Sequence, residues 1–135
     1  MDLKKEYATD KEAEQDGVDV ELGDGGTITV RRTNNKQFRD LLEKLRKPYE
    51  RQIQRGTANK DMIDGLTRKA VARTVLIGWK GIEIDGKAVK YSPEKAEELM
   101  KEFEDFQEDV LFAANSRETF RAEVMEENEK NSGKS

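Results

Sequence analysis

The chain of 135 residues fits one domain, and it carries 40% charged against 34% hydrophobic residues, with a formal net charge of −4. It contains neither cysteine nor histidine, which excludes disulfides, the common structural zinc sites and nucleophiles activated by histidine. The acidic balance argues against a nucleic-acid partner, and the lack of a signal peptide or of an apolar run of about 20 residues argues against a membrane partner.

Residues 1–16 are highly charged and too poor in apolar side chains to form a buried face, so they predict a flexible N-terminal arm. Apolar and polar residues then alternate on both sides of the glycine-rich turn at 23–26, which predicts a β-hairpin near 18–31. A two-stranded hairpin is only marginally stable alone, so its apolar face needs a helix to pack against.

Two helices are expected next. At about 35–54 the apolar residues are spaced by three and four, which predicts an amphipathic helix that Pro48 kinks or ends. A second helix is predicted at about 59–79, ending near Gly78. Its second half, from residue 70 to residue 79, is the most apolar part of the chain, so we expect this helix at the centre of the core.

The remaining elements follow the same reasoning. An Asp-Gly pair between alternating residues predicts a second hairpin near 82–91. A Ser-Pro start and a long apolar stripe predict a helix at 93–114, and a last helix is expected at 117–127 before a disordered tail at 128–135. The sequence therefore predicts an α+β fold that is predominantly α-helical, with about four helices and two small β-hairpins, in a single domain over 17–127.

Five residues are candidates for contact with a protein partner. Arg31 and Arg32 belong to the most basic local stretch, although such a stretch is usually a solvated surface. Trp79 is either an exposed anchor, as tryptophan often is in interfaces, or a core residue at the end of its helix. Phe112 and Phe120 fit the C-terminal apolar stripe least well, and core packing is the alternative for each.

No catalytic, cofactor-binding or metal-binding residue is predicted. Lysines and paired carboxylates remain formally open as catalysts, but 29 acidic residues make chance pairs inevitable. The final Gly133-Lys134-Ser135 copies the end of a phosphate-binding loop, but Asn128 stands where that motif needs its first glycine. We therefore expect a binding protein that needs no cofactor, and not an enzyme.

Three stretches of the sequence carry a family resemblance. The first is LIGWKGIEIDGK (76–87) followed by YSPEKAEELM (91–100), the second runs from Arg31 to Tyr49, and the third is DFQEDVLFAANSRETFR (105–121). Together they resemble tail assembly chaperones of long-tailed, siphovirus-type bacteriophages. The resemblance covers about residues 17–125 and includes no catalytic signature.

The resemblance implies a function. Such chaperones bind the long tape measure protein in the host cell cytoplasm, keep it soluble, help tail tube protein assemble around it, and are absent from the mature virion. Many phages also make a longer form by programmed ribosomal frameshifting near the end of the reading frame, and Gly133-Lys134 is compatible with a slippery codon run. That longer form, or further copies of the chain, would be additional partners.

Two other functions compete with this one. A structural virion component, such as a head–tail connector or a minor tail protein, would be present in purified particles in fixed copy number, whereas a chaperone would be missing. A DNA-associated protein that uses Arg31, Arg32 and Arg39 would be retained on DNA at moderate salt, and the acidic balance predicts no such retention.

Overall fold

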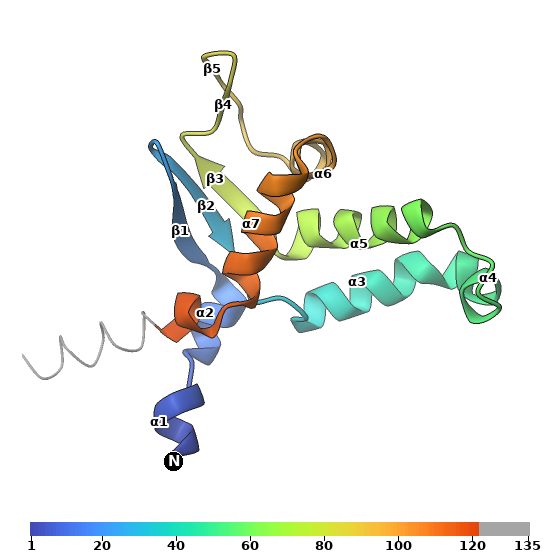
Figure 1. Cartoon of the computed structure of the whole chain (residues 1–135), viewed down its shortest axis with the longest axis horizontal. Helices are drawn as coiled ribbons and strands as arrows, with labels where there is room; N and C mark the ends of the chain where they lie inside the picture. Colours follow the sequence, from blue (N-terminus) through green and yellow to red (C-terminus); the bar gives the residue numbers. More distant parts are fainter. Residues whose placement is uncertain (122–135) are drawn as a thin grey trace, which may run out of the picture.

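The structure is a computed structural model that describes residues 1–121, and it consists of a compact body with one projecting helical arm (Figure 1). The arm is residues 36–69, and the body is the rest of the described chain. The arm contains α3 (Lys36–Arg46), the 3-10 helix η1 (Lys47–Tyr49), α4 (Glu50–Gln54) and the first two-thirds of α5 (Lys60–Thr74).

The body is built on an antiparallel sheet in the order β1-β2-β3. Its strands are β1 (Val18–Gly23), β2 (Gly26–Val30) and β3 (Leu76–Lys80). In the central strand Ile28 and Val30 are fully buried, and Ile28 lies opposite Trp79 of β3. The first predicted hairpin is therefore present as β1 and β2, but a third strand from far along the chain completes its sheet.

The second hairpin, β4 (Glu83–Ile84) and β5 (Lys87–Ala88), also lies where the sequence predicts it. Both hairpin turns place an Asp-Gly pair in the left-handed region. The φ angles are 49° and 80° at Asp24 and Gly25, and 53° and 77° at Asp85 and Gly86. A tight two-residue hairpin turn of this hand needs positive φ at both central residues, which asparagine, aspartate and glycine tolerate best.

The helix predicted at 59–79 is wrong at its C-terminal end, because residues 76–80 form the strand β3. The helix α5 ends at Thr74, and Val75 (φ −115°, ψ −61°) begins the departure into the strand. Side chains from distant segments cap this end of α5. Asn35 Nδ2 donates to the Thr74 carbonyl at 3.0 Å, and the Tyr91 hydroxyl lies 3.1 Å from the Ala72 carbonyl. These bonds satisfy helix-end carbonyls that otherwise lack partners.

The fold class is α+β, but the expected number of about four helices is wrong. The predicted helix at 35–54 is divided into α3, η1 and α4 at Pro48, and the predicted helix at 93–114 is divided into α6 (Pro93–Glu102) and α7 (Glu104–Asn115). The division falls at Phe103, whose backbone (φ −114°, ψ 88°) is not helical. It lets α6 pack against α5 while α7 turns to cross the sheet (Figure 1).

The core lies between the sheet, the end of α5 and helices α6 and α7. Its fully or almost fully buried side chains belong to one cluster: Val18, Ile28, Val30, Val71, Ala72, Val75, Leu76, Ala96, Met100, Val110, Ala113, Ala114 and Phe120. The opposite face of the sheet is more polar, with the Thr29 hydroxyl donating to Asp19 Oδ1 at 2.6 Å. One apolar face and one polar face are the usual arrangement of an antiparallel sheet.

The N-terminal residues form the short helices α1 (Leu3–Tyr7) and α2 (Lys11–Asp16), each capped by the aspartate before it. Residues 117–121 are helical and lie beside them, with Arg121 donating to the carbonyls of Lys5 and Glu6. The rest of the helix predicted at 117–127, and the tail predicted at 128–135, lie outside the described residues. Over residues 1–121, no helix has the length and apolar character needed to cross a bilayer.

Candidate protein-binding surface

The helical arm presents an open face along α3, η1 and α4. Asn35 starts α3 by accepting a hydrogen bond from the Phe38 N–H at 2.8 Å, which is a standard N-cap contact. Gly56, with φ of 70°, lets the chain reverse after α4 so that α5 can return beside α3. One side of α3 packs on α5, and the other side is left to form a groove with α4.

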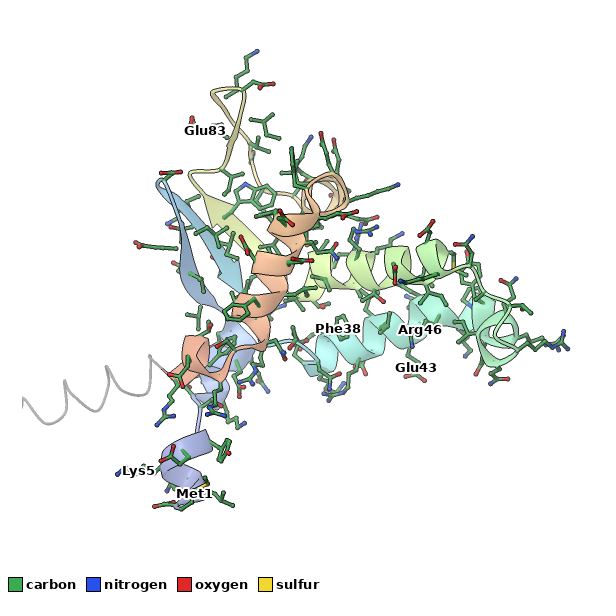
Figure 2. The ribbon with its side chains drawn as sticks, in the orientation of Figure 1. Met1, Lys5, Phe38, Glu43, Arg46 and Glu83 are labelled. Atoms are coloured by element: carbon green, nitrogen blue, oxygen red, sulfur yellow. The ribbon has the colours of Figure 1, made fainter. Side chains whose placement is uncertain are left out.

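We call this groove the arm groove. It has a volume of about 460 Å³ and is lined by residues that all lie between 34 and 54: Asn34, Phe38, Arg39, Leu42, Glu43, Arg46, Lys47, Glu50, Ile53 and Gln54. Phe38, Leu42 and Ile53 supply its apolar floor, and each of them is only half-buried. Phe38, Glu43 and Arg46 mark its course along α3 in Figure 2.

The arm is basic although the chain is acidic. Residues 36–69 carry ten basic and five acidic side chains, a net charge of +5, whereas the rest of the chain carries 15 basic and 24 acidic side chains, a net charge of −9. Among the described residues, the one ion pair within the arm joins Lys36 to Asp40 at 2.7 Å. The Arg46 Nε atom is buried in the arm groove and has no hydrogen-bond partner in the described part of the chain.

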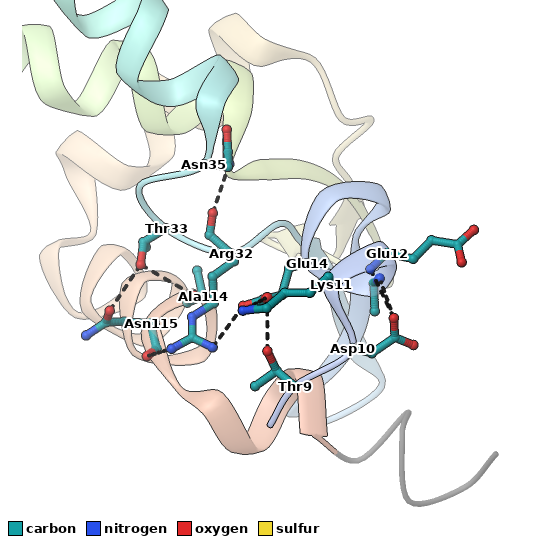
Figure 3. A network of polar contacts seen from close by, with 11 residues as sticks. Thr9, Asp10, Lys11, Glu12, Glu14, Arg32, Thr33, Asn35, Ala114 and Asn115 are labelled. Carbon is teal, nitrogen blue, oxygen red and sulfur yellow. Dashed lines mark hydrogen bonds and ion pairs between the residues drawn. The ribbon is translucent and has the colours of Figure 1, made fainter. Parts of the chain in front are cut away.

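Arg31 and Arg32, the basic pair singled out in the sequence, both contact other groups of the body, and Figure 3 shows the contacts of Arg32. Arg31 Nε donates to the Gln15 carbonyl at 2.7 Å. Arg32 pairs with Glu14 at 3.1 Å, approaches the Asn115 carbonyl at 3.4 Å, and places its guanidinium 5.5 Å from the centre of the Phe120 ring. Arg32 thus joins α2, α7 and the end of the described chain, which is a structural role.

Trp79 lies on β3 and belongs to an aromatic cluster that is partly buried. Its ring meets Tyr91 edge-on at 5.0 Å between centroids and Phe106 at 6.5 Å, and its indole N–H donates to the Val89 carbonyl at 2.7 Å. Burial raises the pKa of the Tyr91 hydroxyl above its ordinary value. Trp79 therefore fastens the second hairpin to the sheet, and it lies on a strand beside the core and not at the end of a helix.

Phe112 and Phe120, the two candidate phenylalanines, have opposite exposure to solvent. Phe120 is 0% exposed and packs in the core, so its side chain is not accessible to a partner in this structure, whereas Phe112 on α7 is 78% exposed. Phe112 lies beside Leu111 and Thr33 over a shallow, very open hollow. Of the five candidates from the sequence, Phe112 alone offers a freely accessible apolar side chain.

A second apolar hollow, of about 420 Å³, lies between the tip of β1, the β4–β5 hairpin and the junction of α6 and α7. Leu22 and Phe103 are the exposed apolar side chains at its edge, at 36% and 45% exposure. Its charged lining consists of Glu83 and Asp85. It is therefore an acidic counterpart, in the body, to the arm groove.

The described residues contain no group of three or more acidic side chains placed to hold a metal ion. Many of their hydrogen bonds and ion pairs tie one element to another, as Arg73 of α5 does with Glu97 of α6 at 2.7 Å. What the geometry offers is surface: an apolar floor, unpaired cations and helices that project from a rigid body. This is suited to binding a helix of another protein.

The sequence reasoning missed the arm groove. The sequence places Phe38 and Leu42 on the apolar stripe of the helix predicted at about 35–54, and it predicts no groove beside that helix. One signal could have drawn attention to the site: basic residues outnumber acidic ones over 36–55. That signal does not show that α4 lies beside the open side of α3, because this depends on how the chain bends at η1.

Comparison with known proteins gives one result. A model of the family described as YdaY prophage protein matches residues 33–131, which is most of the chain and includes the whole arm. No curated protein and no solved structure matches the chain.

Proposed function

The chain belongs to the YdaY prophage protein family and is thus derived from a phage, and we propose that it is a tail assembly chaperone. In this role it binds the tape measure protein in the host cell cytoplasm, keeps it soluble, and promotes assembly of tail tube protein around it. The mature virion would lack it, and a longer frameshifted form would share its fold.

The observation that carries the proposal is the arm groove. A chaperone for a long, aggregation-prone partner needs an accessible apolar surface that does not cause the chaperone itself to aggregate. The arm groove combines half-buried apolar side chains with charged neighbours such as Arg39 and Lys47, so apolar contact is available beside a well-solvated rim. Helix-in-groove recognition uses this combination.

The resemblance to tail assembly chaperones adds support from the same region. The stretch from Arg31 to Tyr49 builds the base of the arm and most of the groove, and LIGWKGIEIDGK forms β3 and the turn into the second hairpin. The matched family segment, 33–131, overlaps most of the span of that resemblance, 17–125. Binding without catalysis, cofactor, nucleic acid or membrane fits this role.

The test is co-expression with the tape measure protein encoded near this gene, scored by solubility and by co-purification. We expect the tape measure protein to stay soluble and to co-purify with this chain, and an unrelated aggregation-prone protein to stay insoluble. A second gene version with synonymous codons at Gly133 and Lys134 removes any slippery run and tests the short form alone.

The virion-component alternative is decided by purified particles. If the chain is present there in fixed copy number, and the tape measure protein aggregates equally with and without it in both gene versions, the chaperone proposal fails. The structural role then replaces it.

A further inference from the structure

We propose that the arm groove binds an acidic amphipathic helix, with the apolar stripe of that helix on the groove floor and its carboxylates against the basic rim. The inference rests on the proposed function only where it identifies this helix as a segment of the tape measure protein. The chemistry of the occupant follows from the groove itself.

The floor selects apolar side chains at helical spacing. Phe38 and Leu42 are one helical turn apart on α3, and Ile53 faces them from α4. All three are only partly buried although they are large and apolar. A volume of about 460 Å³ lies within the common range of binding pockets, roughly 300–1,000 Å³, and accommodates two or three side chains from one face of a helix.

The rim selects negative charge. Arg39, Arg46 and Lys47 line the groove, and no ion pair neutralises any of them within the described residues. Arg39 instead donates to the Asn34 carbonyl at 2.5 Å. Glu43 and Glu50 also line the groove, so the lining alone carries a net charge of only +1.

The wider arm strengthens this preference, because its net charge of +5 attracts an acidic helix and repels a basic one. The buried, unpartnered Nε of Arg46 points to the same chemistry. A buried donor without an acceptor is costly, and a carboxylate that draws this guanidinium toward the groove opening would remove that cost.

Two other occupants fit less well. A nucleic acid would pair its phosphates with the arm but would leave the apolar floor uncovered. A second copy of this chain offers the acidic helices α6 and α7, but their apolar stripes already lie in the core, at Leu99 and Met100 on α6 and at Val110 and Ala113 on α7. Of the apolar side chains on α7, only Phe112 is largely exposed.

The experiment uses the full chain and three synthetic helical peptides of equal length. All carry leucine at positions i, i+3, i+4 and i+7, and the other positions are rich in glutamate, lysine or glutamine. Binding is measured by fluorescence anisotropy, with a single-stranded oligonucleotide as a fourth probe. We expect the glutamate peptide to bind about tenfold or more tighter than the lysine peptide, with the glutamine peptide between them.

Matched variants locate the binding. R39E/K47E reverses two charges that line the groove, on α3 and η1, and K44E/R51E makes the same change outside the groove, on α3 and α4. We expect the groove pair to weaken binding of the glutamate peptide by about tenfold and the control pair by only a few-fold, because the control charges act at longer range. Leu42→Asn should weaken it too, while Leu22→Asn, at the second hollow, should leave it unchanged.

Several outcomes overturn the inference. Equal losses in the two charge-reversal variants mean that only the general field of the arm matters. Tightest binding of the oligonucleotide assigns the arm to nucleic acid. Self-association of the chain that Leu42→Asn abolishes, measured by sedimentation, assigns the groove to a second copy. Circular dichroism and thermal unfolding verify that each variant is folded.

The co-expression test separates this inference from the proposed function. If wild-type chain keeps the tape measure protein soluble and R39E/K47E does so equally well, the chaperone function stands and the groove is not its binding site. If the glutamate peptide binds in the groove but the wild-type chain does not keep the tape measure protein soluble, the groove chemistry stands and the chaperone function fails.

Discussion

The body and the arm differ in how they use apolar side chains. Every side chain classed as buried in the described chain lies in the body or in the last residues of α5, and none lies between residues 31 and 69. The arm helices α3 and α4 have no buried residue, yet α3 is strongly amphipathic in sequence. Part of the apolar surface of α3 therefore packs against α5, and the rest is left open in the arm groove.

Polar contacts show the same contrast. In the body, Arg32, Arg73 and Arg121 reach across the fold to side chains or carbonyls far away in sequence. In the arm, Arg68 Nε donates to Gln107 Oε1 of α7 at 3.0 Å, but the other side-chain contacts of the described arm residues are local, such as Lys36 to Asp40 one turn away. Stability thus resides in the body, and the arm is a region of low local stability whose groups are free to engage a partner. The following predictions test this division, from the largest expected effect to the smallest.

Phe120 and Phe112 give the largest contrast. Phe120→Ala empties a fully buried site in the body and should reduce the free energy of unfolding by about 3–5 kcal/mol. Phe112→Ala removes a side chain that is 78% exposed and should change it by less than about 0.5 kcal/mol. Urea unfolding followed by circular dichroism measures both, and similar losses in the two variants would contradict the placement of Phe120.

These two residues also show how far sequence reasoning reaches. Turn chemistry located both hairpins, and period-three spacing located the helical segments, because these signals are local. The burial of Phe120 is not local: it depends on contacts with α7, β2 and the guanidinium of Arg32. The same residue type at two nearby positions therefore has opposite environments, with no difference in pattern that separates them.

Two element assignments failed for a related reason. Val75 to Trp79 continues the apolar run of α5, and a short apolar run reads equally well as a buried helix or a buried strand. What ends α5 is capping by Asn35 and Tyr91, and what makes β3 a strand is pairing with β2. At Phe103 no glycine or proline marks the break, and the change of direction follows from two packing partners, α5 for α6 and the sheet for α7.

Arg32 gives the next largest effect. Its side chain is 27% exposed and that of Glu14 is 13% exposed, and the pair joins α2 to the body. Arg32→Met should reduce the free energy of unfolding by roughly 1–3 kcal/mol, because Glu14 keeps Lys11 and Thr9 on one carboxylate oxygen but loses the partner of the other at a site with little solvent. Arg39→Met in the arm should cost almost nothing. A double-mutant cycle with Glu14→Gln isolates the pair, and a coupling energy near zero would contradict this role.

Substitutions of Asn35 and Asn59 compare the stability of the two ends of the arm. Asn35 caps α3 at the arm's base and also donates to the carbonyls of Arg32 and Thr74 at 2.8 and 3.0 Å, whereas Asn59 at the tip only caps α5. Asn35→Ala should cost about 1–2 kcal/mol of global stability, and Asn59→Ala about 0.5–1 kcal/mol.

Amide hydrogen exchange shows which segments each of these two substitutions destabilises. Exchange should accelerate along α3 and at the end of α5 in Asn35→Ala, but only in the first turn of α5 in Asn59→Ala. If Asn59→Ala accelerated exchange throughout the sheet, the arm and the body would be one cooperative unit.

Substitution of Tyr91 should have the smallest effect on the free energy of unfolding, and this effect depends on pH. Its hydroxyl lies 2.7 Å from the Leu76 carbonyl and 3.1 Å from the Ala72 carbonyl, and donates its proton where α5 passes into β3. Burial raises the pKa of Tyr91, and Glu94 adds to this rise, while Arg73 and Arg31 oppose it. Because the folded chain holds this proton more tightly than the unfolded chain, the stabilisation is complete below about pH 10 and is lost as the pH rises through the raised pKa.

Tyr91→Phe should therefore be about 1 kcal/mol less stable than the wild type near neutral pH, and the difference should shrink as the pH rises above about 10. Tyr49→Phe in the arm is the matched control, because among the described residues its hydroxyl has no hydrogen-bond partner, and this variant should differ little from the wild type near neutral pH. Urea unfolding of the three proteins from about pH 8 to pH 11 measures the differences directly. A Tyr91→Phe difference that stayed constant over this range would show that the phenol does not bind its proton more tightly in the body, and that the junction of α5 and β3 is held by packing alone.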